Sequence, residues 1–94
     1  MTAANPRWLQ EAPVAGEHLS IVERIVVSPC WGRLRAGELA KGDAVESGTV
    51  IGHLEEAGEQ IPVVSHAAGA FVCWLAWDGQ RLAQGRPVAL IRAT

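Results

Sequence analysis

Apolar residues along this chain gather in short runs that are separated by glycines and prolines. The first well-marked run covers residues 21–27, and Pro29 ends it, because proline donates no ladder hydrogen bond and holds the preceding residue extended. Acid–glycine turns at Gly42 and Gly79 separate later runs of similar length. No amphipathic helix of useful length competes with this pattern. The sequence therefore predicts an all-β fold of short strands.

The chain also contains an internal repeat. Residues 28–54 align without gaps on residues 65–91, and three pairs of glycines stay in register: Gly32 with Gly69, Gly42 with Gly79, and Gly48 with Gly85. Glycine at such positions indicates a positive φ or a close strand crossing that leaves no room for a Cβ. We expect each half to be a meander of short strands. Neither half alone can bury its apolar face, so the two halves are expected to pack around an approximate two-fold axis.

Residues 26–92 contain, in order, the motifs P-x-x-G, G-D, G-x-V-I-x-x-L, a hairpin, S-x-x-x-G and G-x-P-V-x-x-I. This order resembles the biotinyl/lipoyl attachment domain family, in particular biotin carboxyl carrier proteins. The resemblance implies a barrel-sandwich hybrid, which is a flattened β-barrel of two quasi-symmetric four-stranded halves. It also implies a domain at residues 19–94 that follows an N-terminal arm at residues 1–18.

The hairpin between the two halves departs from the family at one position. The family carries its cofactor on a lysine at the hairpin tip, usually within E-A-M-K-M, whereas this tip reads Glu55, Glu56, Ala57, Gly58 and Glu59. Counting from Gly42 and back from Gly69 places Gly58 at the lysine position. Biotin and lipoate are attached as amides to a lysine amine, and glycine offers no nucleophile. The resemblance therefore implies a domain without a cofactor. The only lysine, Lys41, lies in a turn and needs no functional explanation.

Charge and targeting signals exclude several classes of protein. The net charge is −2 and the eight basic residues are dispersed, so no nucleic-acid-binding surface is expected. No apolar stretch is long enough to span a bilayer and no signal peptide is recognisable, which favours a cytoplasmic protein without membrane contact. Cys30 and Cys73 belong to no C-x-x-C motif, and we expect both to be reduced and mostly buried.

Candidate catalytic and metal-binding residues are scarce. His18, His53 and His66 lack the spacing of local metal ligands, so no metal site is predicted. Ser65 and His66 are adjacent instead of arranged for general-base catalysis, and no G-x-S-x-G motif occurs. We therefore predict that the chain is not an enzyme.

Two surface features are candidates for protein binding. Glu55, Glu56 and Glu59 crowd the hairpin tip with no cation nearby in sequence, so the tip either binds a basic partner or is a solvated turn. The chain has four tryptophans. Trp74 is predicted to lie in the core, with its bulk balanced by Gly37 in the first half. Exposed indoles often mark contacts, so a possible interaction surface is assigned to Trp31, Trp77 and Trp8, although burial under the N-terminal arm would also explain them.

The leading hypothesis is a non-catalytic module that lacks the modifiable lysine. It would act as an accessory, scaffold or interaction subunit of a carboxylase-like or acyl-transfer complex, with biotin carboxylase or acyltransferase-type subunits as partners. The alternative is a functional carrier subunit of a biotin-dependent carboxylase of the acetyl-CoA carboxylase type, with a nonstandard attachment site at Cys30. Edge strands and surface tryptophans are also compatible with a homodimer.

Overall fold

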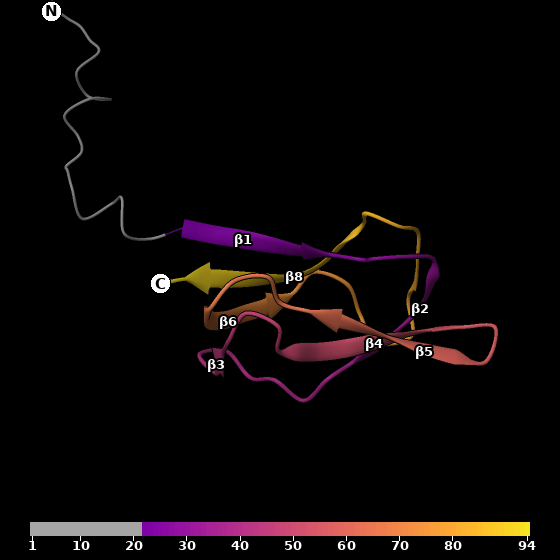
Figure 1. The fold of residues 1–94 in the computed structure, drawn as a ribbon, viewed down its shortest axis with the longest axis horizontal. Helices are drawn as coiled ribbons and strands as arrows, with labels where there is room; N and C mark the ends of the chain where they lie inside the picture. The colour runs from indigo at the N-terminus through magenta and orange to yellow at the C-terminus, as the bar shows by residue number, and fades with distance from the viewer. Residues whose placement is uncertain (1–21) are drawn as a thin grey trace, which may run out of the picture.

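The computed structural model describes residues 22–94, which form eight strands and, within this range, no helix (Figure 1). The strand expected at 21–27 is β1, with Ile21 outside the described residues; Trp8, His18 and the predicted arm at 1–18 also lie outside them. The strands are β1 (Val22–Val27), β2 (Gly32–Ala36), β3 (Ala44–Val45), β4 (Val50–Glu56), β5 (Glu59–Val64), β6 (Gly69–Trp74), β7 (Arg81–Leu82) and β8 (Pro87–Ala93).

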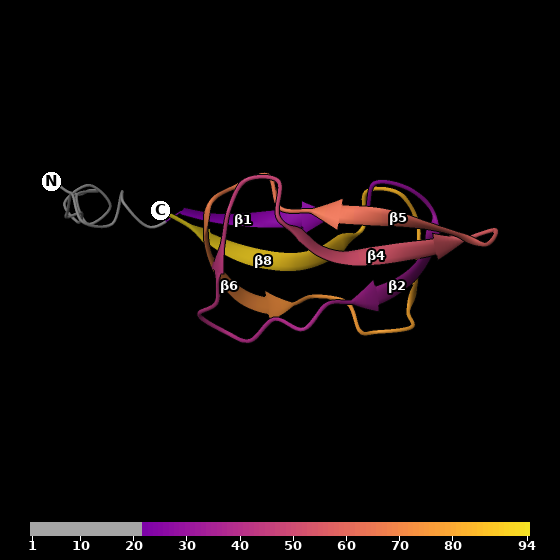
Figure 2. The ribbon, with the colours of Figure 1, turned by 60° about the horizontal axis from the view of Figure 1, so that its bottom comes forward.

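The strands form two antiparallel four-stranded sheets, in the orders β1-β8-β6-β3 and β5-β4-β2-β7. Figure 2 shows β1 beside β8, and β5 beside β4, around the flattened interior. Adding 37 to the first residue numbers of β1, β2, β3 and β4 gives the first residue numbers of β5, β6, β7 and β8. When each strand is replaced by its equivalent in the other half, the order of one sheet becomes the order of the other. The predicted all-β barrel-sandwich with two quasi-symmetric halves is therefore confirmed.

The expectation that each half is a meander is wrong. A meander pairs consecutive strands, whereas the only consecutive strands that pair are β4 and β5, which join the two halves. Each sheet instead takes two strands from each half of the sequence. The halves are interleaved because a lone half leaves its apolar face uncovered, and exchange of strands covers both faces at once.

The repeated glycines serve the two purposes expected from the sequence. Gly48 and Gly85 adopt φ of +93° and +85°, which L-residues with a side chain rarely adopt. Their amides donate to the carbonyl oxygens of Ser65 and Ser28, at 2.7 and 2.8 Å, so each glycine closes a turn against the other half. Gly69 instead allows a close approach, because a Cβ there would overlap the carbonyl oxygen of Arg92.

The core lies between the two sheets and draws on both halves. Its buried side chains include Leu34, Val45, Ile51, Leu54, Phe71, Leu82, Val88 and Ile91. Trp74 is half-buried instead of fully enclosed, and its ring lies 5.1 Å from that of Phe71 at an interplanar angle of 58°. Gly37, predicted from the sequence to balance the bulk of Trp74, also has a reason in the backbone. Its Cβ is excluded by the backbone carbonyl of Ile51, to which the Gly37 amide donates at 3.0 Å.

The two cysteines are free thiols, but only one fits the prediction of burial. Cys30 is half-buried in the β1–β2 loop and packs against the core. Cys73 is exposed on β6, so the expectation that both are mostly buried is wrong for Cys73. The reason is local: the register of β6 against β8 shifts between Phe71 and Cys73, and this irregularity changes which face of the sheet Cys73 occupies.

Candidate functional site

The β4–β5 hairpin carries the position at which the sequence predicts a missing lysine. Glu56 pairs with Glu59 across the hairpin, which leaves Ala57 and Gly58 as a two-residue turn. Both turn residues have positive φ, 52° for Ala57 and 82° for Gly58, as a type I′ turn requires. A Cβ added to Gly58 would meet no atom within 4 Å. Position 58 therefore lies at an open, solvent-facing tip.

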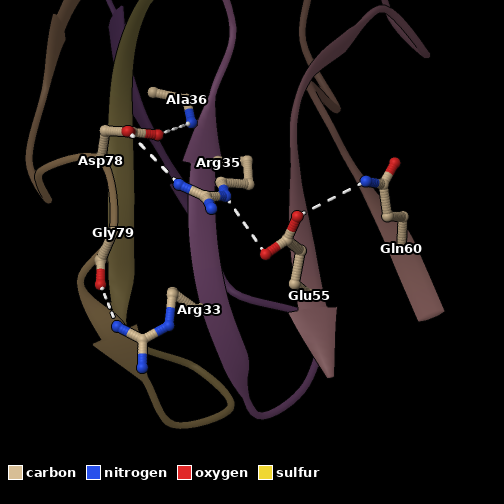
Figure 3. Close-up of polar contacts among 7 residues, drawn as sticks. All are labelled: Arg33, Arg35, Ala36, Glu55, Gln60, Asp78 and Gly79. Atoms are coloured by element: carbon tan, nitrogen blue, oxygen red, sulfur yellow. Dashed lines mark hydrogen bonds and ion pairs between the residues drawn. The ribbon is translucent and has the colours of Figure 1, made fainter. Parts of the chain in front are cut away.

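Arg35 on β2 supplies a cation that the sequence pattern did not reveal. Its Nε lies 3.1 Å from Oε1 of Glu55, and its Nη1 lies 3.7 Å from Oδ2 of Asp78 (Figure 3). Asp78 also accepts a hydrogen bond of 2.9 Å from the amide of Ala36. Arg35 thus links the base of the hairpin to the β6–β7 loop. The cation was missed because β2 and β4 are adjacent only after the sheet forms.

A groove of about 430 Å³ runs along the hairpin from Glu55 to the turn. Two arginines line it: Arg33 stands opposite Arg81 in the β2–β7 register, and Nη1 of Arg33 donates to the carbonyl oxygen of Gly79 at 2.9 Å. Residues 55–60 of the hairpin form the rest of the lining. The acidic end of the hairpin, where Glu56 and Glu59 face each other, therefore shares this groove with two arginines of β2 and β7. The sequence predicted only the acidic part.

The candidate tryptophans of the described chain are exposed but lie apart. Trp31 is 58% exposed and directly precedes Gly32, the first residue of β2. Trp77 is 70% exposed and precedes Asp78, which contacts Ala36 at the other end of β2. Beside Trp77 is a hollow of about 390 Å³, lined by Ala36, Trp74, Leu75, Ala76 and Asp78. The two indoles therefore flank β2 at opposite ends. The third candidate, Trp8, lies outside the described residues.

The remaining candidate residues, Ser65 and His53, take part in the hydrogen bonding and strand pairing of the fold. The Oγ of Ser65 is buried and donates to the carbonyl oxygen of Ala67 at 2.6 Å, so this hydroxyl is engaged in shaping its loop. His53 stands opposite Pro62 on one side and Arg35 on the other. Among residues 22–94, no three of the His, Cys, Asp and Glu side chains gather as a metal site would require. The same part of the chain contains no helix long and apolar enough to cross a membrane.

Comparison with known proteins gives matches at the level of structure. No protein-family model matches the sequence, and a search of curated proteins finds no match. Among solved structures, a single-chain, multi-domain long-chain acyl-CoA carboxylase matches 77% of this chain with 21% identity and a TM-score of 0.68. The urea carboxylase of Kluyveromyces lactis matches 74% of it with 26% identity and a TM-score of 0.68. The chain shares its fold with segments of both carboxylases.

A third match shows that the fold is not confined to carboxylases. The succinylglutamate desuccinylase/aspartoacylase of Rhodobacter sphaeroides matches 73% of this chain with 18% identity and a TM-score of 0.57. The chain spans only 7% and 6% of the two carboxylases and 21% of this third protein. A shared fold does not fix a function, which depends instead on the chemistry of the hairpin and of the surface.

Proposed function

We propose that this chain is a biotinyl/lipoyl-like module that lacks the modifiable lysine and acts as an accessory, scaffold or interaction subunit of a carboxylase-like or acyl-transfer complex. The observation that carries the proposal is Gly58 in the exposed two-residue turn of the hairpin. Likeness to segments of two carboxylases over about three quarters of the chain supports the choice of complex.

The chemistry of the hairpin favours binding over group transfer. The turn offers a methyl group at Ala57 and no side chain at Gly58, so neither residue can form the amide that holds biotin or lipoate. Glu56 and Glu59 carry carboxylates to the outer end of the hairpin, where they are exposed. Such charges steer a basic partner into register more than they add affinity, because each exposed ion pair is worth about 0–1 kcal/mol.

The exposed tryptophans are proposed as further contacts with a protein partner. Trp31 and Trp77 expose more than half of their surface, and tryptophan is over-represented among the residues that dominate binding energy at interfaces. Since the two indoles flank β2 on separate loops, we expect a partner either to span this strand or to use one loop at a time. Biotin carboxylase or acyltransferase-type subunits remain the proposed partners.

The direct test is the intact mass of the protein purified from its native host. We expect the mass of the unmodified chain. A mass increased by one biotinyl or lipoyl group would contradict the proposal. Capture of partners from the same host is the second measurement, with a Glu56→Lys/Glu59→Lys variant compared with a Glu38→Lys/Glu46→Lys control that reverses two exposed charges elsewhere. Partners that bind the hairpin should be lost from the first variant only.

The alternative, a carrier with its arm on Cys30, is tested by alkylation of the native protein. Cys30 is half-buried and packs against the core, whereas Cys73 is exposed. We expect a thiol reagent to modify Cys73 within minutes and Cys30 far more slowly. Untreated protein that is unfolded in urea should show two free thiols. A Cys30 thiol that is already blocked by a removable adduct would favour the carrier alternative instead.

A further inference from the structure

The outer face of sheet β1-β8-β6-β3 carries a row of apolar side chains. Ile25 on β1 stands opposite Leu90 on β8, and Leu90 stands opposite Cys73 on β6. Ile91, the neighbour of Leu90, is fully buried, and successive residues of a strand point to opposite faces, so this row points outward. Ile25 is 56% exposed and Cys73 is also exposed. The three side chains form a stripe across three strands.

The stripe continues on one side and ends on the other. Val27, the next outward residue of β1, is 45% exposed and stands opposite Pro87 of β8. In the other direction lies an ion pair, in which Nη2 of Arg92 is 3.0 Å from Oε2 of Glu23. The apolar stripe is therefore bounded by this ion pair on one side, and it runs up to the outermost strand of the sheet, β1.

The equivalent face of the other sheet does not share this character. The offset of the repeat places Pro62 where Ile25 stands and His53 where Leu90 stands, and these two residues pair with each other. Arg35 faces His53 from β2 and forms the ion pair with Glu55 on this same sheet. An apolar outer face is thus a property of one sheet's side chains and is not required by the fold.

The outer edge of β1 differs from the outer edge of β5, its equivalent in the other sheet. Within residues 22–94, β1 and β5 are equivalent edge strands, each hydrogen-bonded to one neighbouring strand, β8 and β4 respectively. Edge strands are commonly protected from pairing by proline or by charge at their centre. β5 carries Pro62 at its centre, whereas β1 contains no proline and carries Ile25 at the equivalent position, next to the charged Arg24. β1 thus keeps every backbone amide along its edge, and these amides can pair with another strand.

We propose that β1 pairs antiparallel with β1 of a second copy of this chain, with Ile25 opposite Ile25 of the second copy. A two-fold axis makes one residue face itself. A centre at Glu23 or at Arg24 would oppose like charges, which is destabilising. A centre at Val26 would place Arg24 opposite Ser28, beyond the end of the strand. Only a centre at Ile25 pairs residues 23–27 throughout, with Glu23 opposite Val27 and Arg24 opposite Val26.

This register joins the two apolar stripes into one. The row Cys73, Leu90 and Ile25 of each copy becomes a continuous row of six side chains across an eight-stranded sheet. Backbone hydrogen bonds along the β1 edge supply the attraction, and the apolar side chains that flank them exclude water from the junction. The inference does not depend on the missing lysine, so a modified hairpin would leave it standing.

Sedimentation equilibrium of the full chain tests the dimer. We expect the wild-type chain to be a dimer at micromolar concentrations and an Ile25→Lys variant to be a monomer with an unchanged circular dichroism spectrum. Val50→Lys is the matched control, because Val50 is similarly exposed, at 49%, on the other sheet, and this variant should remain a dimer. A monomeric wild-type chain, including one that uses this face to bind a different protein, would overturn the proposal.

Disulfide trapping tests the register. In a Cys73→Ser background, Ile25→Cys should form a disulfide between copies, because directly opposite residues have Cα atoms about 4.5–5.5 Å apart, within the range of a disulfide. Glu23→Cys in the same background is the control. Its two copies would lie about 14 Å apart, four residues along the strand, and should not crosslink. Efficient crosslinking of Glu23→Cys together with failure of Ile25→Cys would refute the register.

Discussion

At the scale of single residues, backbone conformation explains Gly58 without reference to any lost chemistry. Both central residues of the β4–β5 turn need positive φ, and glycine adopts it with the least strain. Ala57 is the only described non-glycine residue with positive φ. The turn therefore carries strain at Ala57, whereas Gly58 adopts its conformation without strain.

The first prediction exploits this difference. Ala57→Gly should stabilise the protein by about 0.5–1 kcal/mol, because relief of the left-handed conformation outweighs the added chain entropy of the unfolded state. Gly58→Ala should have the opposite effect, of similar size. Urea unfolding monitored by tryptophan fluorescence measures both changes. The account of the turn fails if Ala57→Gly is the more destabilising of the two.

The second prediction concerns close approaches of the backbone. A Cβ at Gly69 would overlap the Arg92 carbonyl and lie 2.8 Å from the Cα of Ala93. At the equivalent Gly32, the nearest atom is Cβ of Leu54 at 3.0 Å. Gly69→Ala should therefore lower the free energy of unfolding by about 3 kcal/mol and Gly32→Ala by about 1 kcal/mol. The backbone atoms near Gly69 can move aside less easily than the Leu54 side chain near Gly32. Equal losses in urea unfolding would contradict this ranking of the two sites.

At the scale of elements, two buried serines shape equivalent loops. Ser28 Oγ donates to the carbonyl oxygen of Cys30, and Ser65 Oγ to that of Ala67, both at 2.6 Å. Both serines are almost fully buried. Each hydroxyl thus satisfies a carbonyl in the loop between an outer strand and the strand that crosses to the other sheet. The serine pair is part of the repeat, although its purpose could not be deduced from spacing alone.

The third prediction follows from these hydrogen bonds. Ser28→Ala and Ser65→Ala should each lower the free energy of unfolding by about 1 kcal/mol, the usual net value of such a bond. The double variant should lose close to the sum, because the serines serve different loops and share no hydrogen-bond partner. Thermal or urea unfolding of the three variants provides the values. Marked non-additivity would show that the two loops are coupled.

The positions of the strands could be predicted from the sequence better than the strands with which they pair. The glycines and Pro29 marked the turns, so strand positions followed from local chemistry. The pairing partner of a strand depends on how the two halves pack against each other, which local sequence does not reveal. For this reason the prediction of a meander in each half was wrong. The Arg35–Glu55 ion pair was missed for the same reason, since its residues are neighbours only across β2 and β4. The exposed side of Cys73 depends on a register shift that leaves no mark in the sequence.

At the scale of the whole molecule, interleaving makes the two halves mutually dependent. The first half contains only one of its own strand pairs, β2 with β4, and the second half only β6 with β8. The outer strands β1 and β3 pair with strands of the second half, and β5 and β7 with strands of the first. A single two-stranded pair is marginally stable at best in water. Neither half should therefore fold alone.

The fourth prediction is that two fragments, residues 1–57 and 58–94, fold only when mixed. The cut falls in the Ala57-Gly58 turn, so it removes one exposed connection and no strand. Circular dichroism and amide spectra should show each fragment unfolded and the mixture native-like. The mixture should also be less stable than the intact chain and more stable at higher concentration, because association replaces a tether. If residues 1–57 unfold cooperatively as a monomer on their own, the first half has a sufficient core and interleaving is not what holds the fold together.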